Sequence, residues 1–312
     1  MVEAKAMRVV FGEMLCQLAE EFPEMVVLDA DVSSSTQTRM FARKYPQRFY
    51  NFGVAEANMV SAAAGMSTCG LIPVASSFAF LLATRAADTV RSHVAYGRLN
   101  VKLAGGYAGL SDHADGASHQ SLMDLAVMRA MPNMTVLVPS DAETTRGAVR
   151  AMLAHHGPAY LRLSRAPVGS CHGADETFQI GRACLLREGS DVTLAVCGTL
   201  LAEALAAAEA LAAEKIAAAV LEFGTVKPLD VDALCYWAGR TGAVVAVEEH
   251  SVHGGFGGAV AEALAENRPV KLRRVGVKDR FAESGPYEAL LDKYGLSAPH
   301  IARAARELLA GG

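Results

Sequence analysis

The sequence lacks the long hydrophobic run that a membrane-spanning helix requires. Hydrophobic residues make up 52% of the 312 residues, yet no stretch of about 18 uninterrupted apolar residues occurs. The first ten residues, MVEAKAMRVV, also lack the apolar core and small-residue cleavage site of a secretory signal. We therefore expect a cytoplasmic protein with no membrane partner.

Runs of Lys and Arg and closely spaced Cys pairs are absent as well. The formal net charge is −4 and no basic stripe is visible, which argues against nucleic acid as a partner. The six cysteines are scattered through the chain, as is usual for small core residues in a reducing compartment. The length and the 20% of charged residues predict a globular chain of two domains.

Short apolar segments alternate with longer helical patterns, which predicts an α/β fold with mostly parallel sheets. The expected helices of the first unit include 55–68, 79–96 and 140–155, the last with a capping box of Ser140 and Glu143. Pro and Gly interrupt the pattern between 164 and 190. We predict a first domain at 1–166, a linker at 167–190 and a second domain at 191–312. The expected strands are 25–28, 72–75, 101–104, 135–138 and 159–163, followed by 192–196, 217–222, 243–247 and 270–275.

Glu56 lies in one of the segments that follow the expected strands, where open parallel sheets bind their ligands. It opens a helix of small and apolar residues. An acid in a first turn is commonly only a partner of the helix dipole. However, a carboxyl group beside Val54 and Met59 is expected to be poorly solvated, which suits it to sharing a proton with a ligand.

Three other segments at strand ends contain polar or aromatic residues that a purely structural hydrophobic core would not require. The segment 29–38, which contains Asp31 and Ser35, also suits an ordinary turn and helix cap. The aromatic residues of 76–85 are compatible with a core position. The Gly-rich segment 105–120 has no periodicity, and polar loops of this length are often functional. Its His113, Asp115 and His119 lack the spacing of a zinc site, so we predict a substrate loop and no metal ligands in this chain.

Two conspicuous motifs predict structure rather than chemistry. The segment 254–258, GGFGG, does not keep the spacing of a dinucleotide-binding fingerprint, and a tight, close-packed turn explains it better. Glu248, Glu249 and His250 at the preceding strand end are compatible with an acid–base pair. Polar strand ends are common, however, and we favour a structural role.

Taken together and in order, these segments resemble the C-terminal half of the transketolase family over nearly the whole chain. Arg8 lies in MRVVFGEML, Glu56 in FGVAEANM, Phe78 in SSFAF, and Asp115 and His119 in ADGASHQ. The resemblance continues through MPNMTVLVPSD, LSR, VKPLD and EEHSVHGGFG. It implies a pyrimidine-binding domain with a mostly parallel sheet, followed by a transketolase C-terminal α/β domain.

The resemblance implies thiamine diphosphate as the cofactor, with a glutamate on its aminopyrimidine ring and aromatic residues stacked against it. A glutamate that shares its proton with a ring nitrogen favours the imino tautomer, which can activate the thiazolium ring. Leu81 lies where the family often has a second aromatic residue, a role that Phe80 can cover in part. The implied cofactor contacts are Asp31, Glu56, Phe78, Phe80 and Leu81.

The resemblance also implies a sugar-phosphate substrate, with Glu56 and His119 as catalytic residues. Arginine and hydroxyl groups suit a phosphate. Two departures bear on specificity: Tyr107 replaces a usual histidine, and His113–Ala114 replaces a usual Gly-Glu. The implied substrate contacts are Arg8, Ser35, Tyr107, Asp115, His119 and Arg165.

No Gly-Asp-Gly segment occurs in the sequence, although transketolases hold the diphosphate and Mg²⁺ through one. We therefore expect one subunit of a split transketolase in an α2β2 heterotetramer, whose partner binds the diphosphate and Mg²⁺. Alternatives are the beta subunit of a 2-oxo-acid dehydrogenase first component, a non-catalytic paralogue and, less favoured, a deoxyxylulose phosphate synthase.

Overall fold

Seven strands form the sheet of the N-terminal unit in the computed structural model, which describes residues 5–173 and 178–311. Neighbouring strands pair in parallel except at β12, which joins one edge antiparallel. In spatial order the strands are β12 (Thr225–Lys227), β6 (Thr135–Leu137), β7 (Ala159–Arg162), β5 (Lys102–Gly106), β4 (Ile72–Phe78), β2 (Met25–Asp29) and β3 (Phe49–Asn51). The predicted α/β class with mostly parallel sheets is confirmed.

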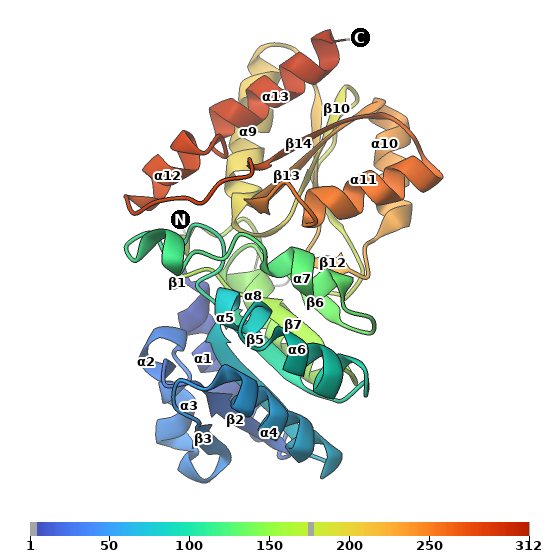
Figure 1. Ribbon diagram of the computed structural model, residues 1–312. Coiled ribbons are helices and arrows are strands. Elements are labelled where there is room, and N and C mark those ends of the chain that lie inside the picture. The colour runs from blue at the N-terminus through green and yellow to red at the C-terminus, as the bar shows by residue number, and fades with distance from the viewer. Residues whose placement is uncertain (1–4, 174–177, 312) are drawn as a thin grey trace.

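Five strands form the sheet of the C-terminal unit, which lies above the first unit in Figure 1. They are β14 (Lys271–Val277), β13 (Ala243–Ser251), β10 (Val192–Val196), β11 (Ala218–Glu222) and β9 (Cys184–Arg187), all parallel except β9. Two short strands, β1 (Lys5–Ala6) and β8 (Pro167–Val168), form a separate antiparallel pair. The segment predicted as a linker thus contains β8 and β9, and β12 ties the C-terminal half of the chain to the first sheet.

Helices cover both faces of each sheet, because the buried parallel strands are apolar on both sides. In the N-terminal unit, one face packs against α1 (Met7–Leu18) and α8 (Ala142–Ala154). The other face packs against α4 (Glu56–Thr68), α5 (Ala79–Ala83), a π-helix (Val90–Ala95) and α7 (Asp124–Ala130). Shorter elements are α2 (Ser33–Thr36), α3 (Arg39–Lys44), α6 (Ala87–Thr89) and 3-10 turns at Pro46–Arg48, Gly116–Ser118 and Gly198–Leu200.

In the C-terminal unit, α9 (Leu201–Ala213), α12 (Tyr287–Lys293) and α13 (Ala298–Ala310) cover one face of the sheet. The other face packs against α10 (Val231–Thr241) and α11 (Phe256–Asn267), and this core is continuous with that of α4 and α5 in the first unit. In the part of the chain that the structure describes, no helix combines the length and apolarity needed to cross a bilayer.

Two details of the predicted helices are wrong. The helix expected at 79–96 is broken after Ala83, where the Thr84 hydroxyl donates to the Phe80 carbonyl at 2.6 Å and so competes with the helical pattern. The capping box of α8 consists of Asp141 and Thr144 rather than Ser140 and Glu143. The Asp141 carboxylate accepts from the Thr144 amide at 2.9 Å, and the Thr144 hydroxyl accepts from the Asp141 amide at 3.0 Å.

The polar end of β13 has a structural role, as predicted. The carboxylate of Glu248 accepts hydrogen bonds from the amides of Phe256 (2.6 Å) and Gly257 (2.9 Å), which begin α11. A side chain at Gly255 would collide with Glu248 and His250, so the GGFGG segment is a close-packed turn.

The neighbouring Glu249 joins the two units. Its Oε1 accepts from the Leu110 amide at 2.6 Å, and its Oε2 accepts from the hydroxyls of Thr199 (2.6 Å) and Tyr287 (2.9 Å). Arg162, at the end of β7, donates to the Glu249 carbonyl at 3.0 Å and pairs with buried Asp124 at 2.8 Å. These bonds fix the C-terminal unit over the loop that follows β5.

Candidate active site

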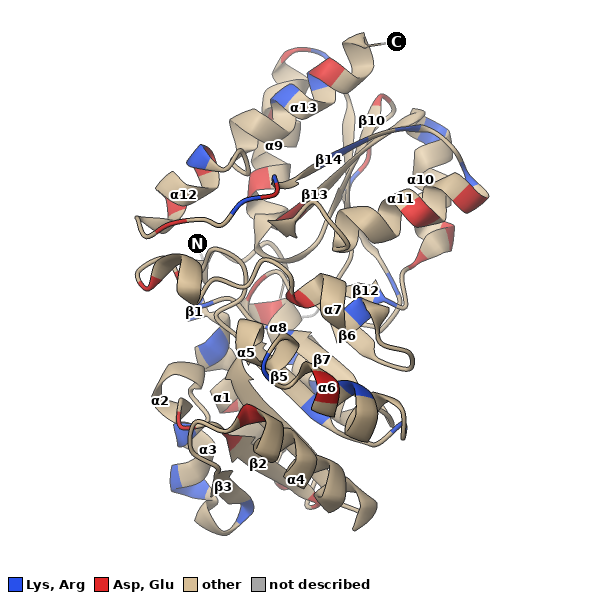
Figure 2. Ribbon diagram, in the orientation of Figure 1, with Lys and Arg blue, Asp and Glu red and all other residues tan. Residues whose placement is uncertain are grey.

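Glu56 is the first residue of α4 and is buried, with 1% of its surface exposed. Ala55 before it has a non-helical backbone, and the rest of α4 is almost free of charge (Figure 2). Its Oε2 accepts from Arg85 Nη1 at 2.9 Å, while its buried Oε1 has no hydrogen-bond partner among the described residues. Because a buried polar atom normally has a partner, Oε1 is available to a donor on a bound ligand.

Four rings gather where β4 and β5 end. Phe78 lies 4.7 Å from Tyr107 and 6.0 Å from His119, measured between ring centroids. Phe80, at the start of α5, lies 5.5 Å from His119 in an edge-on arrangement. These separations are those of favourable aromatic contacts. The structure therefore brings together four of the predicted site residues from two separate segments, 76–85 and 105–120, and Leu81 is buried in α5.

Two guanidinium groups flank Tyr107. Arg8 of α1 lies 5.6 Å from the ring centroid and Arg165, which follows β7, lies 5.0 Å from it. Arg8 Nη1 also donates to the Tyr107 hydroxyl and to the Ser35 carbonyl, both at 3.0 Å. Ser35 therefore contacts Arg8 through its backbone. Two cations beside one tyrosine ring form a site suited to an anionic group.

Arg165 is also held by two carboxylates of the Gly-rich loop. Its Nη1 lies 2.6 Å from buried Asp112 Oδ1 and 3.5 Å from Asp115 Oδ2. Burial, together with the neighbouring Asp115, raises the pKa of Asp112 to about 6, against the opposing effect of Arg165. Asp112 was not among the predicted site residues, although its place in the Gly-rich segment 105–120 was the available signal.

Asp31 contacts Asn51 rather than any of these rings. It has a left-handed backbone (φ 66°), and its Oδ1 accepts from Asn51 Nδ2 at 2.9 Å. The turn that holds it depends on Asp29, the first residue of the segment 29–38, whose acids and hydroxyls also suit an ordinary turn. Buried Asp29 accepts from the hydroxyls of Thr36 (3.0 Å) and Thr38 (2.7 Å), and burial raises its pKa.

The two histidines of the Gly-rich loop, His113 and His119, have different hydrogen-bond partners. His113 Nδ1 lies 3.1 Å from the Gly285 carbonyl, whereas His119 Nδ1 lies 2.9 Å from the Ser118 hydroxyl. Within the described ranges, these histidines and Asp115 do not form a cluster with metal-ligand spacing. The loop presents His119 and Asp115 on the side of the rings and of Arg165, which fits contacts with a polar substrate.

A cavity of about 680 Å³ opens beside Phe80. Its lining includes Ser118, Gln120, Met123 and Phe281. Phe281 is 80% exposed and Met123 is 46% exposed. Exposed apolar side chains next to a site often indicate a binding surface.

The comparisons with known proteins cover both units. Residues 3–169 match the family model "Transketolase, pyrimidine binding domain", and residues 181–301 match "Transketolase, C-terminal domain". The buried Glu56, the rings and the arginines all lie in the first matched range.

Three relatives are similar over nearly their full length. The 6-deoxy-6-sulfo-D-fructose transketolase subunit SqwH of Clostridium sp. (strain MSTE9) is 44% identical, covering 98% of this chain and 95% of that protein. A putative transketolase C-terminal section of Methanocaldococcus jannaschii is 43% identical, covering 96% of this chain and 95% of that protein. A solved structure described as a split gene transketolase, inactive beta4 tetramer, is 47% identical with a TM-score of 0.92 and covers 98% of both chains.

Proposed function

The chain belongs to the transketolase family, and from that premise we propose that it is the pyrimidine-binding subunit of a split, thiamine-diphosphate-dependent transketolase. It would transfer a two-carbon ketol unit from an anion-bearing ketose to an aldose. The observation that carries the proposal is the buried carboxylate of Glu56, whose Oε1 has no partner in the described part of the chain.

The site fits the aminopyrimidine end of the cofactor. Glu56 Oε1 would accept a hydrogen bond from a ring nitrogen and hold the proton that sets the tautomer. Phe78 and Phe80 form an apolar wall for a flat ring, with Leu81 buried in the same helix as Phe80. Asp31 stays a predicted cofactor contact. When bound, thiamine diphosphate supplies the nucleophile and electron sink for carbanion chemistry.

The other end of the site fits the anionic end of a sugar. Arg8 and Arg165 both lie close to the ring of Tyr107, and their charge and N–H donors suit a phosphate or a sulfonate. We assign the sugar hydroxyls to Asp115 and His119, and a proton-transfer role at the reacting centre to His119. The name of the Clostridium relative specifies a sulfosugar, which supports testing both anions.

A partner subunit would complete the site. The chain contains no Gly-Asp-Gly segment, so we assign the diphosphate and Mg²⁺ to a second chain in an α2β2 assembly. Val54, which precedes Glu56, is 70% exposed, and exposed Met123 and Phe281 line the cavity beside Phe80. These apolar side chains support a partner surface at the mouth of the site.

The test is a ketol-transfer assay of the reconstituted pair of subunits with thiamine diphosphate and Mg²⁺. We expect transfer from xylulose 5-phosphate or from 6-deoxy-6-sulfofructose to an aldose acceptor. Decarboxylation of a 2-oxo acid without ketol transfer would instead identify a dehydrogenase component. No turnover with any donor, despite a stable complex, would identify a non-catalytic paralogue.

A further inference from the structure

Three potential metal ligands meet where the two units join, beside the capping box of α8. His172 follows β8, Cys184 begins β9 and Glu222 ends β11. Their nitrogen, sulfur and oxygen ligand atoms all lie within 4.8 Å of one another. The His172 and Glu222 side chains are 1% and 3% exposed, so two of the three groups are shielded from water.

The ring of His172 is held in a fixed orientation by Asp141. Its Nδ1 lies 2.9 Å from Asp141 Oδ2, which also accepts from the backbone amides of Cys171 (2.8 Å) and His172 (3.1 Å). This leaves Nε2 facing the other two groups. Histidines that bind metals almost always donate their second ring N–H to a carboxylate or carbonyl in this way.

The Nε2 atom of His172 is buried without a hydrogen-bond partner among the described residues. It lies 2.8 Å from Glu222 Oε2, close enough for an ion pair. The second oxygen of Glu222 accepts from the Ser140 hydroxyl at 2.5 Å, which holds the carboxylate in place. A buried nitrogen and a fixed carboxylate oxygen this close together, with a thiol beside them, form a donor set that suits one cation.

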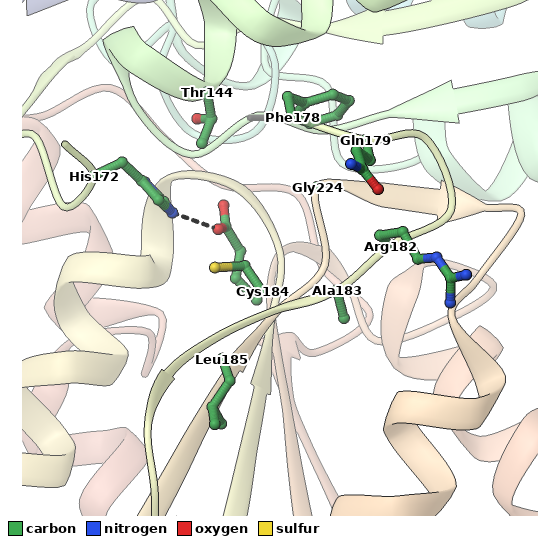
Figure 3. Close-up of a pocket in the computed structure, with 10 residues that line it drawn as sticks. Thr144, His172, Phe178, Gln179, Arg182, Ala183, Cys184, Leu185 and Gly224 are labelled. Atoms are coloured by element: carbon green, nitrogen blue, oxygen red, sulfur yellow. Dashed lines mark ion pairs between the residues drawn. The ribbon is translucent and has the colours of Figure 1, made fainter. Parts of the chain in front are cut away.

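A cavity of about 320 Å³ adjoins the three groups. Figure 3 shows the side chains of His172 and Cys184 among the residues that line it. Three protein ligands leave one position of a tetrahedral zinc ion open, and the cavity has room for a water molecule there. A mixed nitrogen, sulfur and oxygen set favours zinc over Mg²⁺ or Ca²⁺, which prefer oxygen ligands.

We propose that His172 Nε2, Cys184 Sγ and Glu222 Oε2 bind one Zn²⁺ ion per chain, with Asp141 positioning His172. Binding would release the thiol proton and any proton on Nε2 to solvent. Asp141 belongs to the first unit, whereas Cys184 and Glu222 belong to the second sheet. The bound ion would therefore link His172, which lies between the two units, to residues of both units. This structural role does not depend on the proposed catalytic function.

The competing account is an ion cluster without a metal. Burial lowers the pKa of His172, but contacts with Asp141, Cys184 and Glu222 together raise it to about 12, so an imidazolium between two carboxylates is feasible. The two accounts differ in their need for Cys184, because an ion cluster needs only the imidazolium and the carboxylates.

The experiment is titration of the full-length chain with Co²⁺ and Zn²⁺ after removal of metals with a chelator. We expect one ion per chain and a thiolate-to-Co²⁺ charge-transfer band that added Zn²⁺ abolishes. Cys184→Ser should lose the band, while Cys69→Ser, at an exposed position, should keep it. Less than one bound ion per wild-type chain, or a band unaffected by Cys184→Ser, would overturn the proposal.

A second variant tests the positioning role of Asp141. Asp141→Asn keeps a good helix cap for α8 but removes the charge behind His172. We expect Zn²⁺ affinity to fall about 10- to 100-fold with stoichiometry unchanged. Zn²⁺ should also raise the Tm of the wild type and not of Cys184→Ser. An affinity equal to that of the wild type would contradict the assignment of Asp141.

Discussion

At the residue scale, Glu56 combines burial with an incomplete set of hydrogen bonds. An acid that merely complements a helix dipole is typically exposed and contributes about 0.3–1 kcal/mol. Glu56 is 1% exposed, and only one of its oxygens is paired. Burying a carboxylate in this way is costly unless a ligand completes its contacts. The dipole role that the sequence left open therefore does not explain this residue.

We predict that Glu56→Gln lowers kcat of the reconstituted enzyme by about 10²- to 10⁴-fold, the usual contribution of a group that handles a proton in catalysis. The matched control is Glu143→Gln, which removes an acid from the first turn of α8. Steady-state kinetics with thermal unfolding of both variants separates catalysis from folding. Equal kinetic losses in both variants would show that Glu56 acts only on its helix.

Arg165 and Arg8 should act on substrate binding rather than on the chemical step. A hydrogen bond to a charged group contributes about 1.5–3 kcal/mol, so Arg165→Gln should raise KM for a phosphorylated or sulfonated ketose about 10- to 100-fold. The KM of the corresponding uncharged ketose should change little. Arg150→Gln, an exposed arginine that pairs with Glu21, is the control. A similar loss for charged and uncharged donors would refute the assignment.

Lys102 gives a prediction about pH and stability. The side chain is buried, its amine donates to the Asn100 side chain (2.7 Å) and the Gly157 carbonyl (2.8 Å), and burial lowers its pKa from 10.5 to about 7. Between these values the unfolded chain binds more protons than the folded chain, so this group makes the free energy of unfolding rise with pH.

Urea denaturation of the wild type and of Lys102→Met measures this effect. The stability of the wild type relative to the variant should increase by about 1 kcal/mol per pH unit from about pH 7 to about pH 10. Lys271→Met, at an exposed position of β14, controls for the loss of a lysine elsewhere. A difference between wild type and Lys102→Met that does not vary with pH would show that burial does not perturb Lys102.

At the scale of elements, the turn before α11 depends on the absence of a side chain at Gly255. A Cβ there would meet the Glu248 carboxylate that caps the helix. Overpacking of this kind typically costs about 1–3 kcal/mol, so Gly255→Ala should lower the Tm. At Gly258, inside α11, a Cβ meets only ordinary contacts, and Gly258→Ala should stabilise by about 0.5–1 kcal/mol. Thermal unfolding in which both variants behaved alike would contradict this packing.

The strands with continuous apolar runs could be predicted from the sequence because local composition determines them. The short strands β9 and β12 could not, since each is formed by antiparallel pairing at the edge of a sheet rather than by a local pattern. The break in the helix after Ala83 and the one-residue shift of the α8 cap depend on single hydroxyl groups, Thr84 and Thr144.

Some residues of the candidate site could also be predicted from the sequence, and others could not. Glu56, Phe78 and His119 belong to motifs that are visible in the sequence. Arg85 and Asp112 are defined by partners 29 and 53 positions away in the sequence, and no local spacing identifies such pairs. The His172 cluster joins α8, β9 and β11, and was invisible for the same reason.

At the scale of the whole molecule, the residues of the candidate site lie close to exposed apolar side chains. The cores of the two units are continuous through α4, α5, α10 and α11, so their relative position does not need a partner to define it. What a partner would add is the diphosphate and Mg²⁺ site and a cover for exposed Val54, Met123 and Phe281.

If the proposed function holds, the chain alone should fold, self-associate and be inactive. Analytical ultracentrifugation should show a homo-oligomer that converts to a mixed assembly when a subunit with the Gly-Asp-Gly segment is added. Ketol transfer should appear in proportion to the amount of that mixed assembly.

Phe281→Glu should weaken the mixed assembly, because it places a charge in an apolar surface, while leaving the Tm of the isolated chain unchanged. Full activity of the isolated chain would rule out the split site, since a cofactor held at one end only cannot be positioned for reaction.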